Sequence, residues 1–252
     1  MSIEILKKMA RDSQLFSFNE LYAKTKIKKD ILWVIISRLE EQGFIERIER
    51  GKYLIIPLGS EKGGYTLHEF VIGSCLVKPY AIGYWSALHH YGMTEQIPNT
   101  VFIQTPARKK NRLIDVFGIS YQIVRINEEK YFGLKREWIE NIAISITDKE
   151  KTVIDCLDKP EYSGGVIEVV KALKNDIFNA QKMSEYAKKI DNDAVVRRLG
   201  YLCEKMNISI DLPEIKSKNY LSLDPTMPKK GINNWKWRLV INLDIPSPGA
   251  LE

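Results

Sequence analysis

The segment SFNELYAKTKIKKDILWVIISRLEEQ, residues 17–42, has the pattern of two consecutive helices. Ser17 and Glu20 have the spacing of a capping box, in which each side chain bonds to the backbone amide of the other residue. A second helix is expected over residues 28–42, and Gly43 stands where a helix commonly ends. The core face of this helix is predicted from apolar residues at helical spacing, namely Leu32, Ile35, Ile36 and Leu39.

Short strands follow this helical segment. Residues 44–48 and 53–56 predict a hairpin, in which Gly51 can adopt the positive φ of a tight turn. Residues 2–10 have the apolar spacing of a further helix. Helix, helix, turn, helix and hairpin is the order of a winged helix-turn-helix, so we expect residues 1–57 to form such a domain.

The basic residues of this region suggest a polyanionic partner. Residues 1–60 contain 11 basic and 8 acidic residues, a net charge of 11 − 8 = +3. Lysine and arginine side chains that neutralise phosphates release counterions, and a recognition helix enters the major groove of DNA. We therefore expect the contacts with duplex DNA to come from Lys26, Lys28, Lys29, Trp33, Ser37, Arg38, Arg47, Arg50 and Lys52.

Two features favour a different partner for the same surface. Trp33 and Val34 are expected on the outward face of the helix, where an apolar side chain distinguishes little beyond a thymine methyl group. Several carboxylates nearby would repel phosphate, namely Glu40, Glu41, Glu46 and Glu49. A protein-interaction module, or a homodimer contact through Trp33 and Val34, is the alternative.

The remainder of the chain is expected to be an α+β domain with a helical middle. Polar residues and glycines that interrupt helices and strands mark a linker at 58–64. The larger domain would therefore occupy residues 65–252 and fold on its own core. The capping-box pattern Thr147-Asp148-Lys149-Glu150 predicts a helix that ends before Pro160. Other helices are expected at 67–76, 85–91, 166–174, 180–190 and 193–206, and strands at 101–105, 120–126, 142–146 and 235–243.

Composition places the chain among globular proteins. Its 252 residues include 38 Lys+Arg and 32 Asp+Glu, a net charge of +6, with 44% hydrophobic and 28% charged residues. No apolar run approaches the length of a membrane span, and the N-terminus lacks the pattern of a secretory signal. The scattered cysteines fit neither a disulfide framework nor a metal pair. We expect a cytoplasmic protein with no membrane partner.

Catalytic patterns are sparse in this sequence. His89 and His90 are adjacent, so on a helix they point about 100° apart and cannot share a metal. The spacing of Asp115, Glu128 and Lys130 is similar to the Asp…Glu-x-Lys arrangement of Mg²⁺-dependent nucleases, although a polar turn explains the same residues. We expect no catalytic set, no cofactor and no metal, with the nuclease as the less favoured alternative.

A second basic block follows Pro106 in the larger domain. It is an exposed loop or a contact with nucleic acid or an acidic partner, and it contains Arg108, Lys109, Lys110 and Arg112.

Several segments of the larger domain resemble those of AbiEi-type antitoxins. GYWSALHHYGMTEQ at 83–96 is similar to one family block, TDKEKTVIDCL at 147–157 to a second, and RLGYL at 198–202 to a third. The similarity extends over residues 15–243, with Lys151 where the family usually has arginine. These antitoxins are transcriptional regulators of type IV toxin-antitoxin systems, which act in phage abortive infection.

The resemblance implies a regulator with two activities. Its winged helix would bind inverted repeats and repress its own operon, with a homodimer on the DNA as one form. Its larger domain would counter a nucleotidyltransferase-like toxin without forming a stable complex. Partner contacts are then expected at Glu150, Lys151, Arg197 and Arg198, in addition to the basic loop. A stand-alone regulator that senses a small ligand is the alternative consistent with the same residues.

Overall fold

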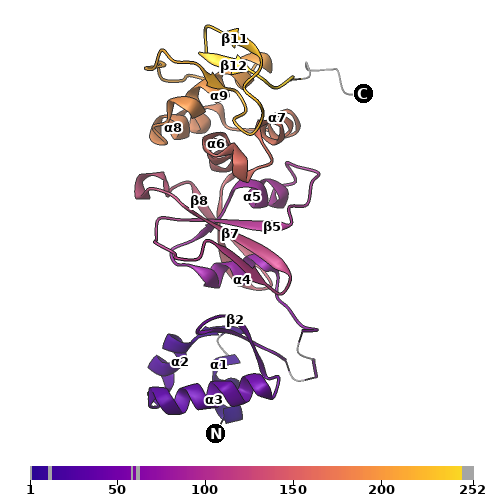
Figure 1. Cartoon of the computed structure of the whole chain (residues 1–252), viewed down its shortest axis with the longest axis vertical. Helices are drawn as coiled ribbons and strands as arrows, with labels where there is room; N and C mark the ends of the chain where they lie inside the picture. Colours follow the sequence, from indigo (N-terminus) through magenta and orange to yellow (C-terminus); the bar gives the residue numbers. More distant parts are fainter. Residues whose placement is uncertain (1, 11–12, 58, 61–62, 246–252) are drawn as a thin grey trace.

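The computed structural model describes residues 2–10, 13–57, 59–60 and 63–245, and these form an α+β protein (Figure 1). Figure 1 shows an N-terminal unit, a central sheet and a helical layer following one another along the long axis. A small sheet containing β11 and β12 closes the end opposite the N-terminal unit. None of the helices in the described ranges is long and apolar enough to cross a bilayer.

The N-terminal unit combines helices with a short antiparallel sheet. Its sheet order is β1-β3-β2, with Leu15 opposite Leu54. The predicted helices and hairpin are present, whereas β1 was not predicted. In chain order the elements are α1 (Ser2–Ala10), β1 (Leu15–Ser17), α2 (Phe18–Thr25), α3 (Lys29–Glu41), β2 (Ile45–Glu49) and β3 (Lys52–Ile55).

Local signals in the sequence explain this unit. The capping box at the start of α2 is confirmed, since Ser17 Oγ accepts from the Glu20 amide at 3.2 Å and Glu20 Oε2 accepts from the Ser17 amide at 2.7 Å. Gly51 turns the hairpin with φ of +79°. The predicted core face of α3 is buried in full, and Leu21 of α2 belongs to the same apolar cluster.

The central sheet is mixed. In the described residues its strand order is β6-β7-β5-β4-β9-β8, with parallel pairing of β5 to β7 and of β4 to β9. Helix α4 (Glu69–Leu76) covers the face toward the N-terminal unit and α5 (Tyr84–His90) covers the other (Figure 1). The strands are β4 (Ala81–Ile82), β5 (Thr100–Thr105), β6 (Leu113–Val116), β7 (Ile119–Arg125), β8 (Leu134–Ile139) and β9 (Ile142–Thr147).

The helical layer packs on the α5 side of the sheet. Its elements are η1 (Glu128–Lys130), α6 (Lys149–Asp158), η2 (Pro160–Tyr162), α7 (Val166–Asn175), α8 (Ala180–Lys189) and α9 (Asp193–Lys205). The closing sheet has the order β10-β12-β11, formed by β10 (Leu221–Ser222), β11 (Ile232–Asn234) and β12 (Leu239–Ile241).

Two predictions for this part of the chain were wrong in detail. Thr147 does not cap α6, because it is the last residue of β9, and Asp148 takes the role by accepting from the Lys151 amide at 2.9 Å. The continuous strand predicted over residues 235–243 is instead a turn followed by β12.

The N-terminal unit and the sheet share apolar contacts. Ile48, Leu54 and Ile56 belong to the same buried cluster as Leu67 and Phe70 near the start of the sheet unit. Each unit also has a buried cluster of its own, and this further cluster extends across the boundary. Figure 1 shows β2 on the side of the N-terminal unit that faces α4.

Candidate nucleic-acid interface

Helix α3 lies at the end of the molecule farthest from the helical layer (Figure 1), and its exposed side carries basic, acidic, polar and apolar side chains, Asp30 and Glu41 among them. Because four residues of α3 point inward at helical spacing, the residues between them are turned to solvent. Lys29, Ser37 and Arg38 are among these exposed residues. Ser37 Oγ lies 3.3 Å from Glu41 Oε1, one turn further along the helix.

Basic side chains gather where α2 passes into α3. Lys26 ends α2 in the left-handed conformation, with φ of 54°, and its amide bonds to the Tyr22 carbonyl at 2.8 Å. Lys28 occupies the N-cap position of α3, where no described side chain caps the helix. A helix N-terminus has a positive dipole end and unbonded amides, so it attracts anions, and the lysines add full charges there.

Aromatic contacts hold α2 and α3 together at this surface. The Trp33 ring stacks on Phe18 with ring centroids 4.1 Å apart, while 40% of Trp33 is exposed. The Lys29 ammonium lies 5.3 Å from the centre of the Tyr22 ring. Trp33 therefore packs one side of its ring against α2 and is available to a partner only on the other.

Apolar residues also lie on the exposed side of α3. Ile31 and Val34 are about half exposed, at 51% and 50%. Sequence reasoning identified Val34 but not Ile31, although the helical spacing that buries Leu32 also turns Ile31 outward. Such side chains suit a thymine methyl group or a second apolar surface.

The predicted basic residues of the hairpin point in two directions, toward solvent and toward the sheet unit. Arg50 is exposed at the tip. Arg47 also reaches solvent, but its guanidinium bonds to Glu40 of α3 at 2.8 Å. Lys52 turns toward the sheet unit, where its ammonium donates to the Leu76 carbonyl at 2.7 Å. Lys52 therefore does not join the exposed basic surface, contrary to our expectation, because a carbonyl of α4 holds its amine.

The basic side chains of the loop between β5 and β6 also point in two directions. Arg108, Lys110 and Arg112 are exposed. Lys109 points back toward the N-terminal unit, where it bonds to both carboxylate oxygens of Glu49, at 2.6 and 2.7 Å. Lys109 is thus occupied within the chain, and the exposed residues of the loop are the ones open to a partner.

Two arginines proposed as partner contacts lie in the interior. Arg197 donates to the carbonyls of Asn219 and Ser217 at 2.8 and 3.1 Å, and its side chain is fully buried. Arg198 donates to the carbonyls of Leu223 and Leu157. Both connect α9 to distant segments, so in this structure they support the fold instead of forming a partner surface.

Glu150 and Lys151 are also buried. Lys151 is fully buried and forms an ion pair with Asp155 one turn along α6. Glu150 accepts from the Asn179 amide at 3.1 Å and from Lys182 at 2.9 Å, which ties α6 to α8. The expected partner contacts at these residues are thus replaced by contacts within the helical layer.

Two residues of the nuclease-like pattern, Asp115 and Lys130, bond to other parts of the chain, and the third, Glu128, is exposed. Asp115 on β6 accepts from Ser120, and Lys130 of η1 bonds to Asp158 of α6 at 2.9 Å. Over the described ranges, no group of three or more His, Cys, Asp or Glu side chains is arranged to hold a metal ion.

Comparison with known proteins shows a likeness of fold. No family model matches the chain, and no curated protein matches its sequence. Its structure is similar to the crystal structure of the RV2827C protein from Mycobacterium tuberculosis, with a TM-score of 0.66 at 13% sequence identity. The match covers 95% of this chain and 90% of the mycobacterial chain. At this identity the likeness concerns the α+β fold alone, over nearly the whole length of both proteins.

Proposed function

We propose that residues 1–57 form a winged helix-turn-helix that binds duplex DNA, and that the chain is a transcriptional repressor of its own operon. The observation that supports this most is the exposed basic surface at the start of α3, formed by Lys26, Lys28 and Lys29. Helix α3 lies on the side of the N-terminal unit that is away from the central sheet (Figure 1).

In this proposal α3 is the recognition helix and enters the major groove by its N-terminal end. The lysines would contact phosphates, whereas Ser37 and Arg38 on the exposed face would approach base edges. Arg50 at the hairpin tip would contact the adjacent minor groove. Ile31 and Val34 would meet thymine methyl groups or a second copy of the chain on the DNA.

We further propose that the larger domain acts as an antitoxin against a nucleotidyltransferase-like toxin. The support is the resemblance of residues 83–96, 147–157 and 198–202 to AbiEi-type antitoxins. The exposed residues that could contact an acidic surface of the toxin are Arg108, Lys110 and Arg112. A nucleotidyltransferase-like gene directly downstream would favour this role. Its absence would favour a stand-alone regulator.

DNA binding is tested with the full chain and a labelled duplex from upstream of its gene. Fluorescence anisotropy at several salt concentrations gives the slope of log K against log salt. The variant Lys28→Ala/Lys29→Ala is compared with Lys229→Ala/Lys230→Ala, an adjacent pair of exposed lysines at the far end of the molecule. Lysines at a helix N-terminus oppose the helix dipole, so among the described contacts their removal costs α3 only that of Lys29 with the Tyr22 ring.

The first pair of substitutions should weaken binding and lower the slope by about 0.9 for each phosphate that is no longer neutralised. The control pair should leave both quantities unchanged. Absence of salt-dependent binding, or equal losses in the two variants, would overturn the proposal.

A further inference from the structure

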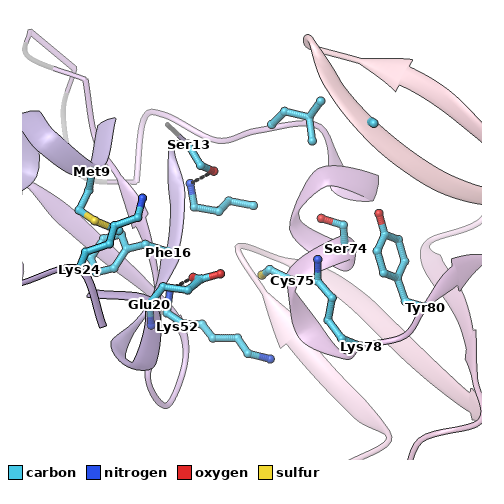
Figure 2. Close-up of a pocket in the computed structure, with 14 residues that line it drawn as sticks. Met9, Ser13, Phe16, Glu20, Lys24, Lys52, Ser74, Cys75, Lys78 and Tyr80 are labelled. Carbon is cyan, nitrogen blue, oxygen red and sulfur yellow. Dashed lines mark hydrogen bonds between the residues drawn. The ribbon is translucent and has the colours of Figure 1, made fainter. Parts of the chain in front are cut away.

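A cavity of about 500 Å³ lies between the N-terminal unit and the central sheet (Figure 2). Figure 2 shows Phe16, Glu20 and Lys52 on one side, with Lys78 and Tyr80 facing them from the other. Pockets for small molecules have volumes of about 300–1,000 Å³. The cavity is therefore large enough for a metabolite, and a molecule bound in it would contact both units.

The charged residues of the lining favour an anion. Among the described residues, the lining contains three lysines and one glutamate, a formal charge of 3 − 1 = +2. The glutamate, Glu20, already accepts from the Ser17 amide in the capping box at 2.7 Å. The lysines are Lys24, Lys52 and Lys78.

Lys78 is the lysine best placed to meet a ligand. It is exposed on the loop after α4, and no ion pair joins it to any acidic residue of the described chain. Its ammonium lies 5.6 Å from the centre of the Tyr80 ring. A phosphate or carboxylate in the cavity would supply a counter-charge that no described acidic residue gives Lys78.

Lys52 contributes a second basic group to the lining. Figure 2 shows it extending from the N-terminal unit toward α4, where the Leu76 carbonyl accepts from it at 2.7 Å. Burial lowers the pKa of Lys52, and the attraction of Glu49, 3.5 Å away, offsets this only in part. An anion bound beside Lys52 would favour its charged form.

Apolar side chains form another part of the lining. Met9, Leu15 and Phe16 contribute from the N-terminal unit, and Ile142 contributes from β9. A site with apolar walls and a few basic groups suits a molecule that has both a ring and a charged group.

We propose that this cavity binds a small phosphorylated molecule with an aromatic or apolar ring, of the size of a nucleoside monophosphate. The phosphate meets Lys52 and Lys78, and the ring lies against Met9 and Phe16. A phosphate monoester has a charge of about −1.5 to −2 at neutral pH, which matches the formal charge of the lining. Because the ligand touches both units, its binding stabilises their junction.

The test is isothermal titration calorimetry of the full chain with AMP, GMP, CMP, UMP and inorganic phosphate, each used separately. No DNA is present, so the result is independent of the function proposed above. The variants are Lys78→Ala, Lys78→Arg and two controls that each remove one exposed charge elsewhere, Arg38→Ala and Lys229→Ala.

At least one nucleotide should bind more tightly than inorganic phosphate, which cannot use the apolar wall. Lys78→Ala should weaken this binding by about tenfold, the order expected for one charge-assisted contact, while Lys78→Arg retains it. The two controls should bind as the unmodified chain does. The proposal is overturned if no nucleotide binds at about 5 mM, or if Arg38→Ala removes binding and Lys78→Ala does not.

Discussion

The ammonium of Lys109 lies 2.6 Å from Glu49 Oε1 and also donates to the Leu76 carbonyl at 2.9 Å. One side chain therefore connects the basic loop of the sheet unit to the hairpin, and it also bonds to the end of α4 within the sheet unit. Both partners of the ion pair are shielded, with 18% of the Lys109 side chain and 22% of the Glu49 side chain exposed. This contact joins the two units beside the shared apolar cluster.

Glu49→Gln should lower the free energy of unfolding by about 1–2 kcal/mol, because it leaves the shielded Lys109 ammonium without its counter-charge. Urea denaturation followed by circular dichroism measures the change. Asp211→Asn is the control. It breaks the ion pair between Asp211 and Lys188, and the Asp211 side chain is 86% exposed, so this pair should add little stability. Equal losses in the two variants would show that the Glu49 pair adds nothing to the junction.

The hairpin offers a test of which basic residues meet DNA. Arg50→Ala should weaken binding and reduce the salt slope by about 0.9, as expected when one cation no longer displaces counterions from the DNA. Lys52→Ala should leave the slope unchanged, because the Leu76 carbonyl holds the Lys52 amine away from the exposed surface. Anisotropy titrations on the same duplex compare the two variants. A reduced slope for Lys52→Ala with a normal slope for Arg50→Ala would contradict the orientation proposed for the hairpin.

Removal of one member of the Lys151–Asp155 pair should be costly. Lys151→Met leaves Asp155 buried without its partner, and a loss of about 3–5 kcal/mol is expected. The double variant Lys151→Met/Asp155→Leu should recover part of that loss, because no uncompensated charge remains. Thermal and urea unfolding of the single and double variants measure both effects. A double variant less stable than the single one would refute this account of the pair.

The pH dependence of stability should include a contribution from Glu150. Burial alone would raise its pKa, but hydrogen bonds from Lys182 and the Asn179 amide outweigh burial and lower the pKa from the ordinary value of 4.5. A lowered folded-state pKa gives a stabilisation that is complete above the unfolded-state pKa and is lost as the pH falls through the folded-state value. Stability should therefore decrease below pH 4.5.

Glu150→Gln removes this titration, so its urea midpoint should vary less with pH in that acidic range than the midpoint of the unmodified chain. Glu214→Gln, at an exposed glutamate, should keep the original steepness. Identical profiles for all three proteins would show that Glu150 does not contribute.

The antitoxin proposal predicts a separation of activities within the full chain. Replacement of Arg108, Lys110 and Arg112 by alanine should impair rescue of cells that express the partner toxin and leave DNA binding unchanged. The full chain is used because the buried cluster extends across both units. Normal rescue by this variant would exclude the loop from the proposed contact.

Sequence alone determined the local features of the N-terminal unit. The capping box of Ser17 and Glu20, the buried spacing along α3 and the turn at Gly51 each depend on residues only a few positions apart. Such interactions form within one element, so their pattern is visible in the printed chain. The short strand β1 was missed because its partner is remote, with Leu15 opposite Leu54.

Tertiary structure alone decided which basic residues face solvent. Lys28, Lys52 and Arg197 are all basic residues within helical or hairpin patterns, yet the first is exposed, the second bonds to Leu76 and the third is fully buried. The difference comes from carbonyl and carboxylate groups supplied by distant segments, such as Asn219 for Arg197. A buried cation is tolerated only where such groups compensate its desolvation, and their positions depend on how the whole chain packs.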